Sequence, residues 1–461
     1  MKYVLLPLLL LAYNLPAQTC DCSTQLTFVK NYFEQNNPAF QHIRSDDKTL
    51  QQYDRNVKGL EGEIRAGASD DNCNLYLERY IALLSDHHSG IGFHMQRLPI
   101  DFTSATQVDS FKSTAAYRSF ARMPADTLQI RALLKDKVLT DVEGYYTNGG
   151  NVHFAILPEK EGVYTGVVVR RNLLMDAGHI LLELKRKDEH TFESVFNTGL
   201  MGFSLQRMYC TLQIRDGQIP ELGFFKPGAK NAATTRPYEF RAIDGKTNYI
   251  RLGSFDRSLI GALDTFYFSI RNELAGKPYL VIDLRDNTGG DEQAYLGLVR
   301  YLYTRPLTID LADVWVSPDN ILRYQEMGMT EPAERMKRAK PYTFIPLVED
   351  PMLTWTMDSM AYPRKVALLY NRNTASAAEG MIIYGLQSDK VITFGESSGG
   401  YIGYGNVTET TMPCGKFTIR CSTTRYAGKM KYEFTGIPPM HPLTEQQDWI
   451  KYATSVLQQA R

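Results

Sequence analysis

The chain has 461 residues, with 51 basic and 51 acidic residues and a formal net charge of zero. This balance shows neither a basic stripe for nucleic acid nor an acidic disordered tail, so we expect no nucleic-acid partner. The length allows two or three domains, each with its own hydrophobic core.

Residues 1–17 have the composition of a signal peptide, with a basic start, an apolar run over residues 4–12 and small residues ending at Ala17. The apolar run is too short to span a bilayer, and no other segment predicts a membrane helix. We therefore expect an exported protein, periplasmic or extracellular. Lipid attachment at Cys20 is the alternative, but Gln18 and Thr19 form a poor lipidation sequence.

The six cysteines of an exported chain favour disulfide bonds. Cys414 and Cys421 flank a strand-like stretch and could bridge a hairpin. Cys20, Cys22 and Cys73 are expected near one another in the N-terminal region. One residue between Cys20 and Cys22 is poor spacing for zinc, so no metal site is predicted.

Residues 18–96 are predicted to be a helical segment, because apolar residues between 24 and 84 recur at helical spacing. The segment ends in Asp86-His-His-Ser89, followed by an apolar strand. The chain has only 8 histidines, so an adjacent pair at a helix exit needs an explanation. Either the pair caps the helix, or one imidazole has a chemical role.

Residues 97–230 change to a strand pattern with short turns, which predicts an inserted antiparallel β domain resembling a small barrel. It lacks a Gly-Leu-Gly-like loop for binding a peptide carboxylate, so no PDZ domain is evident. A structural or regulatory insert and a substrate-capturing domain both remain open.

Residues 231–461 contain two strand–loop–helix units, separated by a stretch from 310 to 358 that we expect to be irregular and to line a cleft. In the first unit a strand ends near Leu284, and Gly289 and Gly290 precede a helix. Adjacent glycines let a backbone approach a ligand closely. No Gly-Lys-Ser/Thr follows, so an oxyanion hole fits better than a phosphate cradle.

The second unit places Ser376 where a strand ends and a helix begins, with another strand at 391–395. A helix start offers free N–H groups, including that of Ala377, and the positive end of the helix dipole. Such a position suits a nucleophile and its oxyanion. The alternative is an ordinary capping box between Ser376 and Glu379.

Three segments of this domain resemble the tail-specific (C-terminal-processing) and tricorn-core serine peptidases. They are Asp283-Leu-Arg-Asp-Asn-Thr-Gly-Gly290, Thr374-Ala-Ser-Ala-Ala-Glu379 and Phe394-Gly-Glu-Ser-Ser-Gly-Gly400. The resemblance implies an α/β catalytic domain of the crotonase/ClpP type, built from repeated ββα units.

The resemblance also assigns roles to individual residues. It implies that His88 is the catalytic base, and that Glu433 completes the site directly or through a hydroxyl such as Ser89. The lysine of the Ser/Lys branch is replaced by Tyr401, and Lys390 is predicted to point away from Ser376. The Ser/His/Glu arrangement of tricorn-like members therefore fits better.

The remaining residues of the first motif are expected to support the oxyanion loop rather than touch substrate. They are Asp283, Arg285 and Asn287.

These features predict an exported serine peptidase that hydrolyses peptide or protein substrates through an acyl-enzyme on Ser376. Backbone N–H groups of Ala377 and of Gly289 or Gly290 would receive the oxyanion. No metal or organic cofactor is required. The alternative is a catalytically inactive family member that binds an apolar ligand or peptide, as retinoid-binding relatives do. The oligomeric state stays open.

Overall fold

The computed structural model describes residues 21–459, apart from 70–71, 125, 173, 205–206, 230–236, 350–353 and 445. The predicted signal peptide and Cys20 lie outside the described residues. Within those residues, we find no helix with the length and apolarity that a membrane span requires.

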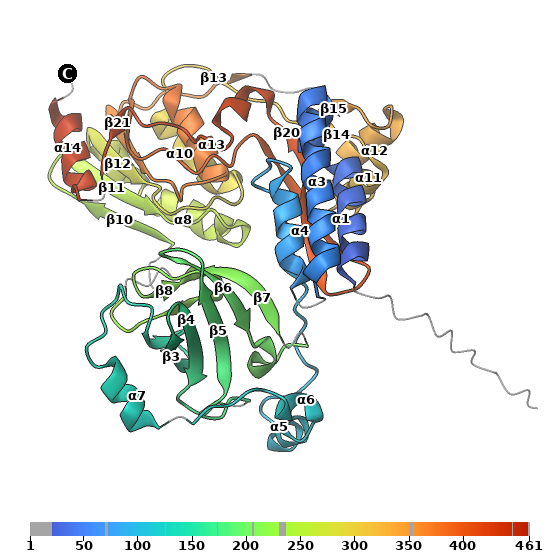
Figure 1. Cartoon of the computed structure of the whole chain (residues 1–461). Helices are drawn as coiled ribbons and strands as arrows, with labels where there is room; N and C mark the ends of the chain where they lie inside the picture. Colours follow the sequence, from blue (N-terminus) through green and yellow to red (C-terminus); the bar gives the residue numbers. More distant parts are fainter. Residues whose placement is uncertain are drawn as a thin grey trace, which may run out of the picture.

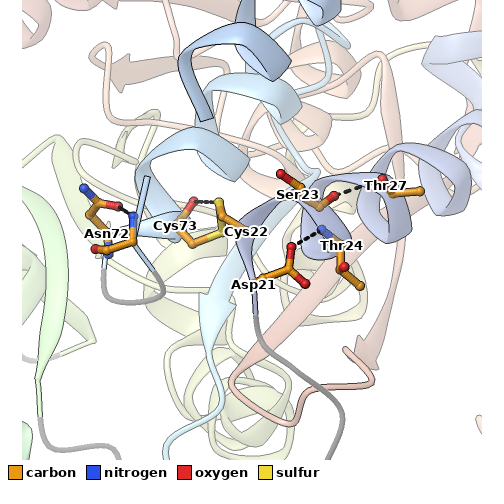
Figure 2. The surroundings of a disulfide bond; sticks show 8 residues. Asp21, Cys22, Ser23, Thr24, Thr27, Asn72 and Cys73 are labelled. Atoms are coloured by element: carbon orange, nitrogen blue, oxygen red, sulfur yellow. Dashed lines mark hydrogen bonds between the residues drawn. A yellow bond between two sulfur atoms is a disulfide. The ribbon is translucent and has the colours of Figure 1, made fainter. Parts of the chain in front are cut away.

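The N-terminal segment is helical, as predicted. It contains α1 (Cys22–Asn36), α2 (Pro38–Arg44), α3 (Asp47–Gly67) and α4 (Cys73–Ala82), of which α1, α3 and α4 stand side by side in Figure 1. Side chains of Asp21, Asn37 and Asp46 accept hydrogen bonds from backbone N–H groups in the first turns of α1, α2 and α3. A disulfide joins Cys22 to Cys73, and Figure 2 shows it linking the first turns of α1 and α4.

The helices pack on a five-stranded sheet to which both ends of the chain contribute. Its strands are β1 (Gly90–Phe93), β14 (Asp313–Trp315), β15 (Phe344–Pro346), β19 (Tyr404–Thr411) and β20 (Phe417–Arg425). β1 pairs antiparallel with β20, so Gly90 lies opposite Arg420. This pairing anchors the histidine loop before β1 to the C-terminal domain.

Cys421 on β20 is completely buried in the core that the helices share with this sheet. It is a free thiol, so the disulfide to Cys414 that the sequence allowed is not formed. Its thiol instead accepts a contact from Asn37 Nδ2 at 3.7 Å.

The region from 97 to 230 begins with helices rather than strands. These are α5 (Ala105–Lys112), α6 (Ala115–Arg118) and α7 (Thr127–Leu134). Side chains of Ser104, Thr114 and Asp126 cap them, a signal that the strand pattern of the later residues obscured.

The predicted antiparallel strands follow these helices and form the lower body in Figure 1. The sheet has eight strands in the order β7-β6-β5-β4-β3-β2-β9-β8. An isolated bridge between Arg215 and Gln218 closes the tight turn that leads from β7 into β8. The strands are β2 (Gly144–Thr147), β3 (His153–Lys160), β4 (Val163–Val168), β5 (Ile180–Arg186), β6 (Thr191–Phe196), β7 (Met208–Gln213), β8 (Gln218–Ile219) and β9 (Phe224–Phe225).

A six-stranded sheet in the order β10-β11-β12-β17-β18-β21 forms the centre of the last domain. Its strands are β10 (Tyr238–Ala242), β11 (Thr247–Leu252), β12 (Tyr279–Asp283), β17 (Lys365–Tyr370), β18 (Val391–Gly395) and β21 (His441–Pro442). All neighbours pair in parallel except β10 and β11. Because β12 and β17 are parallel neighbours, the loops after them meet at one edge.

Helices cover both faces of this sheet, which confirms the predicted α/β fold class. One face packs α8 (Ile260–Ser269), α9 (Arg271–Gly276), α10 (Gln293–Leu302) and α13 (Ala377–Leu386), and the other packs α14 (Trp449–Gln459). Short 3-10 helices complete the chain at η1 (Thr198–Met201), η2 (Pro220–Leu222), η4 (Arg257–Leu259) and η5 (Ala427–Tyr432).

The stretch from 310 to 358 is more regular than expected. It carries β14, β15, α11 (Pro318–Glu326) and α12 (Thr330–Arg338), and β16 (Thr354–Trp355) pairs with β13 (Leu307–Thr308). Trp315 Nε1 donates to the carbonyl of Gln35 at 2.8 Å, and Tyr32 Oη donates to Asp319 at 2.6 Å. This stretch therefore packs against α1.

Candidate active site

Ser376 lies in the turn between β17 and α13. Its backbone has φ +55° and ψ −121°, a region that residues other than glycine rarely occupy and that often marks functional sites. The Ser376 N–H donates to Glu379 Oε2 at 2.9 Å, and the N–H of Gly380 donates to the Ser376 carbonyl at 3.0 Å. These bonds hold the strained turn at the helix start.

His88 reaches this turn from the N-terminal segment, 288 positions away in the sequence. Its Nε2 lies 3.0 Å from Oγ of Ser376. Its ring meets Tyr401 edge to face, with ring centroids 6.1 Å apart. The distance is within hydrogen-bond reach, which a nucleophile and its general base require.

Asp86 shapes the loop that carries His88, a role that sequence reasoning missed. Its Oδ1 accepts hydrogen bonds from the His88 N–H at 2.9 Å and from Ser422 Oγ at 3.1 Å. Its Oδ2 accepts from Ser89 Oγ at 2.6 Å and from Asn37 Nδ2 at 2.9 Å. The Asp-x-His spacing, with the carboxylate two residues before the imidazole, was the available signal.

The surroundings of His88 favour its neutral form. Burial lowers the pKa of His88 below its ordinary value, the nearby Asp86 charge opposes this, and His87 and Arg420 lower it further. Its Nδ1 is buried without a hydrogen-bond partner among the described residues. A neutral ring with an unprotonated Nε2 can accept the proton of Ser376.

Glu433 is placed differently from the expected arrangement. Its carboxylate accepts hydrogen bonds from the N–H groups of Ile402 at 3.0 Å, Gly403 at 2.6 Å and His87 at 3.4 Å. Within the described residues it makes no hydrogen bond to the His88 ring. Ser89 does not bridge the two either, because its hydroxyl donates to Asp86.

The environment of Glu433 also alters its titration. Burial raises the pKa of Glu433 to about 7, although its three backbone hydrogen bonds oppose the shift. The carboxylate therefore changes charge close to neutral pH while it holds the backbone beside His88.

His87 precedes the candidate base in the chain. Its Nδ1 lies 3.1 Å from the Gly400 carbonyl, so this nitrogen carries the proton. The ring stacks on Tyr401 with centroids 4.2 Å apart and contacts Phe434 at 3.9 Å. His87 thus packs the loops together, with its Nδ1 directed at Gly400.

Fewer backbone N–H groups are available to an oxyanion than the sequence predicted. The Gly289 N–H donates to Asn287 Oδ1 at 2.9 Å, so it is already used. The N–H groups of Gly290 and Ala377 have no hydrogen-bond acceptor among the described residues. A β-carbon on Gly289 would lie 2.7 Å from Cβ of Ser376, so glycine is what lets this loop lie against the nucleophile.

The rest of the first motif braces the loop. Asp283 is completely buried and accepts hydrogen bonds from Tyr249 Oη at 2.9 Å and Arg285 Nε at 2.9 Å. Asn287 donates through Nδ2 to the Leu252 carbonyl at 3.0 Å. The backbone carbonyl of Asn287 also accepts from Ala375 at 2.9 Å, which ties the two strand–loop–helix units together.

Glu379 does more than cap α13. It is completely buried and also accepts hydrogen bonds from Ser398 Oγ at 2.6 Å, Gly400 N–H at 2.9 Å and Tyr401 N–H at 2.8 Å. One carboxylate thus connects the turn at Ser376 with the loop that follows β18. The Glu of the capping box and the glycines of the last motif were the signals for this link.

No lysine side chain in the described part of the chain forms a hydrogen bond with Ser376. Lys390 Nζ donates to the Met360 carbonyl at 2.6 Å, and Tyr401 donates its N–H to Glu379 at 2.8 Å. No group of three or more His, Cys, Asp or Glu side chains in the described residues is arranged to hold a metal ion.

A serine hydroxyl beside a buried neutral imidazole, with two N–H groups next to it, is the arrangement that serine hydrolases use for acyl transfer. Residues 246–439 match the model of peptidase family S41. This match confirms the family that the sequence motifs predicted, and the protein is a serine-type peptidase.

Several solved structures are distantly similar over nearly the whole chain. A lipoprotein from Streptococcus agalactiae shows 12% identity and a TM-score of 0.40, covering 100% of this chain and 99% of that one. Mature CPAF complexed with lactacystin shows 13% identity and a TM-score of 0.47, covering 95% of this chain and 97% of that one. The photosystem II D1 C-terminal processing protease shows 13% identity and a TM-score of 0.38, covering 95% of this chain and 97% of that one. No curated protein matches the chain.

Proposed function

We propose that the chain hydrolyses peptide bonds with Ser376 as nucleophile and His88 as its base, in the manner of the tricorn-like branch. The observation that carries this proposal is the 3.0 Å separation between His88 Nε2 and Ser376 Oγ. Two residues so far apart in sequence come this close through the pairing of β1 with β20.

In the proposed acylation, Ser376 Oγ forms a bond to the peptide carbonyl carbon while its proton moves to His88 Nε2. The carbonyl oxygen becomes an oxyanion and accepts hydrogen bonds from the N–H groups of Gly290 and Ala377. The C–N bond then breaks, and His88 donates its proton to the departing amine. Water repeats these steps in reverse order and releases the acid from Ser376.

The carboxylates have different tasks in this proposal. The negative charge of Asp86 stabilises the His88 imidazolium that forms during acylation, because it acts against the effect of burial. Glu433 positions the backbone of His87 and of residues 402–403, and so holds His88 at the right distance from Ser376. Both are positioning residues, since neither touches the reacting atoms.

Labelling with a fluorophosphonate tests the nucleophile directly. We expect labelling and peptide cleavage in the wild type, with loss of both in Ser376→Ala and strong loss in His88→Gln. Matched controls are Ser455→Ala, at an exposed position on α14, and His190→Gln, at a half-buried position in the β domain, both outside the site. Unlabelled wild-type protein, or a Ser376→Ala variant that cleaves as well as the wild type, would contradict the proposal. Lipid that co-purifies with unlabelled protein would favour the inactive ligand-binding alternative.

We also propose that the chain is exported and that residues 1–17 are removed. The Cys22–Cys73 disulfide supports this, because disulfides persist in oxidising compartments. The mass of the protein recovered from outside the cytoplasm should correspond to a chain beginning at Gln18. A protein retained in the cytoplasm with its full N-terminus would contradict export.

A further inference from the structure

The β domain presents a group of exposed apolar side chains on α7 and in the turn after it. Three of the four most exposed large apolar side chains in the described residues are Leu128, Leu133 and Val138, with exposed fractions of 75%, 62% and 60%. Single apolar residues are ordinary at a surface, whereas several together mark an interaction site. Figure 1 shows α7 at the outer edge of the lower body, away from α10 and α13.

Both sides of α7 carry leucines, but only one side is covered. Ile130 and Leu134 are buried in a small core that α7 shares with strands β3 and β4. The other side of the helix is exposed and combines apolar and basic residues, namely Leu128, Arg131, Ala132, Leu133 and Lys135. A helix that is apolar on both sides usually has a neighbour on each. The exposed side of α7 therefore lacks a partner within the described chain.

The turn after α7 is tied to the body of the domain. Lys226 is buried, and its Nζ donates hydrogen bonds to the carbonyls of Val138 at 2.8 Å, Asp141 at 2.6 Å and Glu143 at 2.8 Å. Charge-assisted bonds of this kind hold a backbone firmly. Val138 is therefore presented to solvent by an ordered turn, next to the helix that presents the two leucines.

A basic pocket adjoins the same helix. This cavity of about 400 Å³ is lined by Arg131 of α7, Tyr145 and Thr147 of β2, His153 of β3 and Arg170. None of the described residues that line it is acidic. Arg170 Nη1 lies 3.5 Å from His153 Nε2, and neither arginine forms an ion pair in the described part of the chain. Two cations in one cavity without a carboxylate favour an anionic ligand.

The acidic residues near the pocket have partners of their own. Asp126 accepts the N–H of Leu128 at 2.8 Å as the cap of α7, and Asp141 accepts the N–H of Val138 at 2.8 Å. Asp136 lies 3.9 Å from Lys135 Nζ, and Glu143 lies 3.0 Å from Lys137 Nζ. The two arginines of the pocket are therefore left for a ligand from outside the chain.

We infer that this surface docks the protein on a membrane that contains anionic phospholipids. A bilayer offers both partners at once, because its phosphate groups lie just above its acyl chains. Arg131 and Arg170 donate hydrogen bonds to lipid phosphates, a contact that suits the guanidinium group. Leu128, Leu133 and Val138 insert below the phosphates. So few apolar side chains bind weakly and reversibly, so charge and insertion act together. Docking is independent of the chemistry at Ser376.

Sedimentation with lipid vesicles tests this docking. One set of vesicles is phosphatidylcholine alone, and the other is equal parts phosphatidylcholine and phosphatidylglycerol. We expect the wild type to sediment with the anionic vesicles, and high salt to release it. Arg131→Glu should weaken the binding at least about fivefold, the effect of one cation near an anionic surface. Leu128→Glu should weaken it at least about tenfold, because the inserted leucine is lost.

Matched controls make the same changes on the other side of the chain's sequence. Leu322→Glu on α11 replaces a leucine that is 45% exposed, and Arg338→Glu changes the exposed last residue of α12. Both should sediment as the wild type does. Circular dichroism and fluorophosphonate labelling should be the same in all variants, because none of the changed residues lies in the candidate active site.

Wild-type protein that sediments with neither kind of vesicle overturns the inference, as does binding that Arg131→Glu and Leu128→Glu leave unchanged. Self-association of the wild type without vesicle binding, abolished by Leu128→Glu, also overturns it and assigns the surface to a second copy of the chain. Binding of inorganic phosphate without vesicle binding overturns it as well and assigns the pocket to a soluble anion. None of these outcomes bears on the proposed peptidase activity.

Discussion

Replacing Glu379 with glutamine should destabilise the catalytic domain by several kcal/mol. Glu379 is completely buried, and its two oxygens accept hydrogen bonds from Ser376 N–H, Ser398 Oγ, Gly400 N–H and Tyr401 N–H. A glutamine NH2 group would face a backbone N–H in either orientation. One or two charge-assisted bonds are therefore lost, and at about 1.5–3 kcal/mol for each bond the total is about 2–6 kcal/mol.

Tryptophan fluorescence during guanidinium unfolding measures this loss selectively. All 3 tryptophans, Trp315, Trp355 and Trp449, lie in the C-terminal domain, so the signal does not report on the β domain. The control Glu273→Gln should change the free energy of unfolding by less than about 0.5 kcal/mol, as is usual for exposed sites.

The same substitution should lower kcat, because the acceptor of the Ser376 N–H bond loses its negative charge and the strained turn is held less firmly. A loss of stability below about 1 kcal/mol in Glu379→Gln would refute the reasoning. It would mean that burying this carboxylate costs as much free energy as its hydrogen bonds return.

Three further outcomes follow from the contacts around the site. Asp86→Asn removes the charge that raises the pKa of His88. The value of kcat/KM should therefore fall by about tenfold to a hundredfold, and the acid limb of its pH profile should move to lower pH. An acid limb that does not move would show that Asp86 has a purely structural role. The pKa of Glu433 is raised from 4.5 to about 7 in the folded state, so between these pH values the folded state holds a proton that the unfolded state has lost. The free energy of unfolding should therefore decrease as pH rises through this interval. Glu433→Gln should flatten this pH dependence, and a variant with an equally steep dependence would contradict the raised pKa of Glu433. The cysteines of the Cys22–Cys73 disulfide are 51 positions apart. Removing this disulfide should lower the free energy of unfolding of the N-terminal helices, followed by circular dichroism, by about 4 kcal/mol. A loss below about 1 kcal/mol would be inconsistent with this expectation.

The sequence was sufficient for the local features of the catalytic domain. Buried strands such as 279–283 and 365–370, followed by glycines or a capping serine, predicted the two strand–loop–helix units and the family. These signals lie within about twenty neighbouring residues, where hydrophobic periodicity and turn chemistry act directly on the backbone. The helices between 105 and 134 and those between 318 and 338 were missed because each is only 4 to 9 residues long, which gives a periodic apolar pattern too few turns to stand out.

Only the tertiary structure decided which groups meet around Ser376. Motifs nominated His88 and Glu433 together, but the fold brings the first to the serine hydroxyl and directs the second to backbone N–H groups of Ile402 and Gly403. It also places Asp86 behind the histidine. The reason is physical: a hydrogen bond is directional and needs its atoms within about 3 Å. Strand pairing between distant segments, such as β1 with β20, sets those distances, whereas spacing along the chain does not.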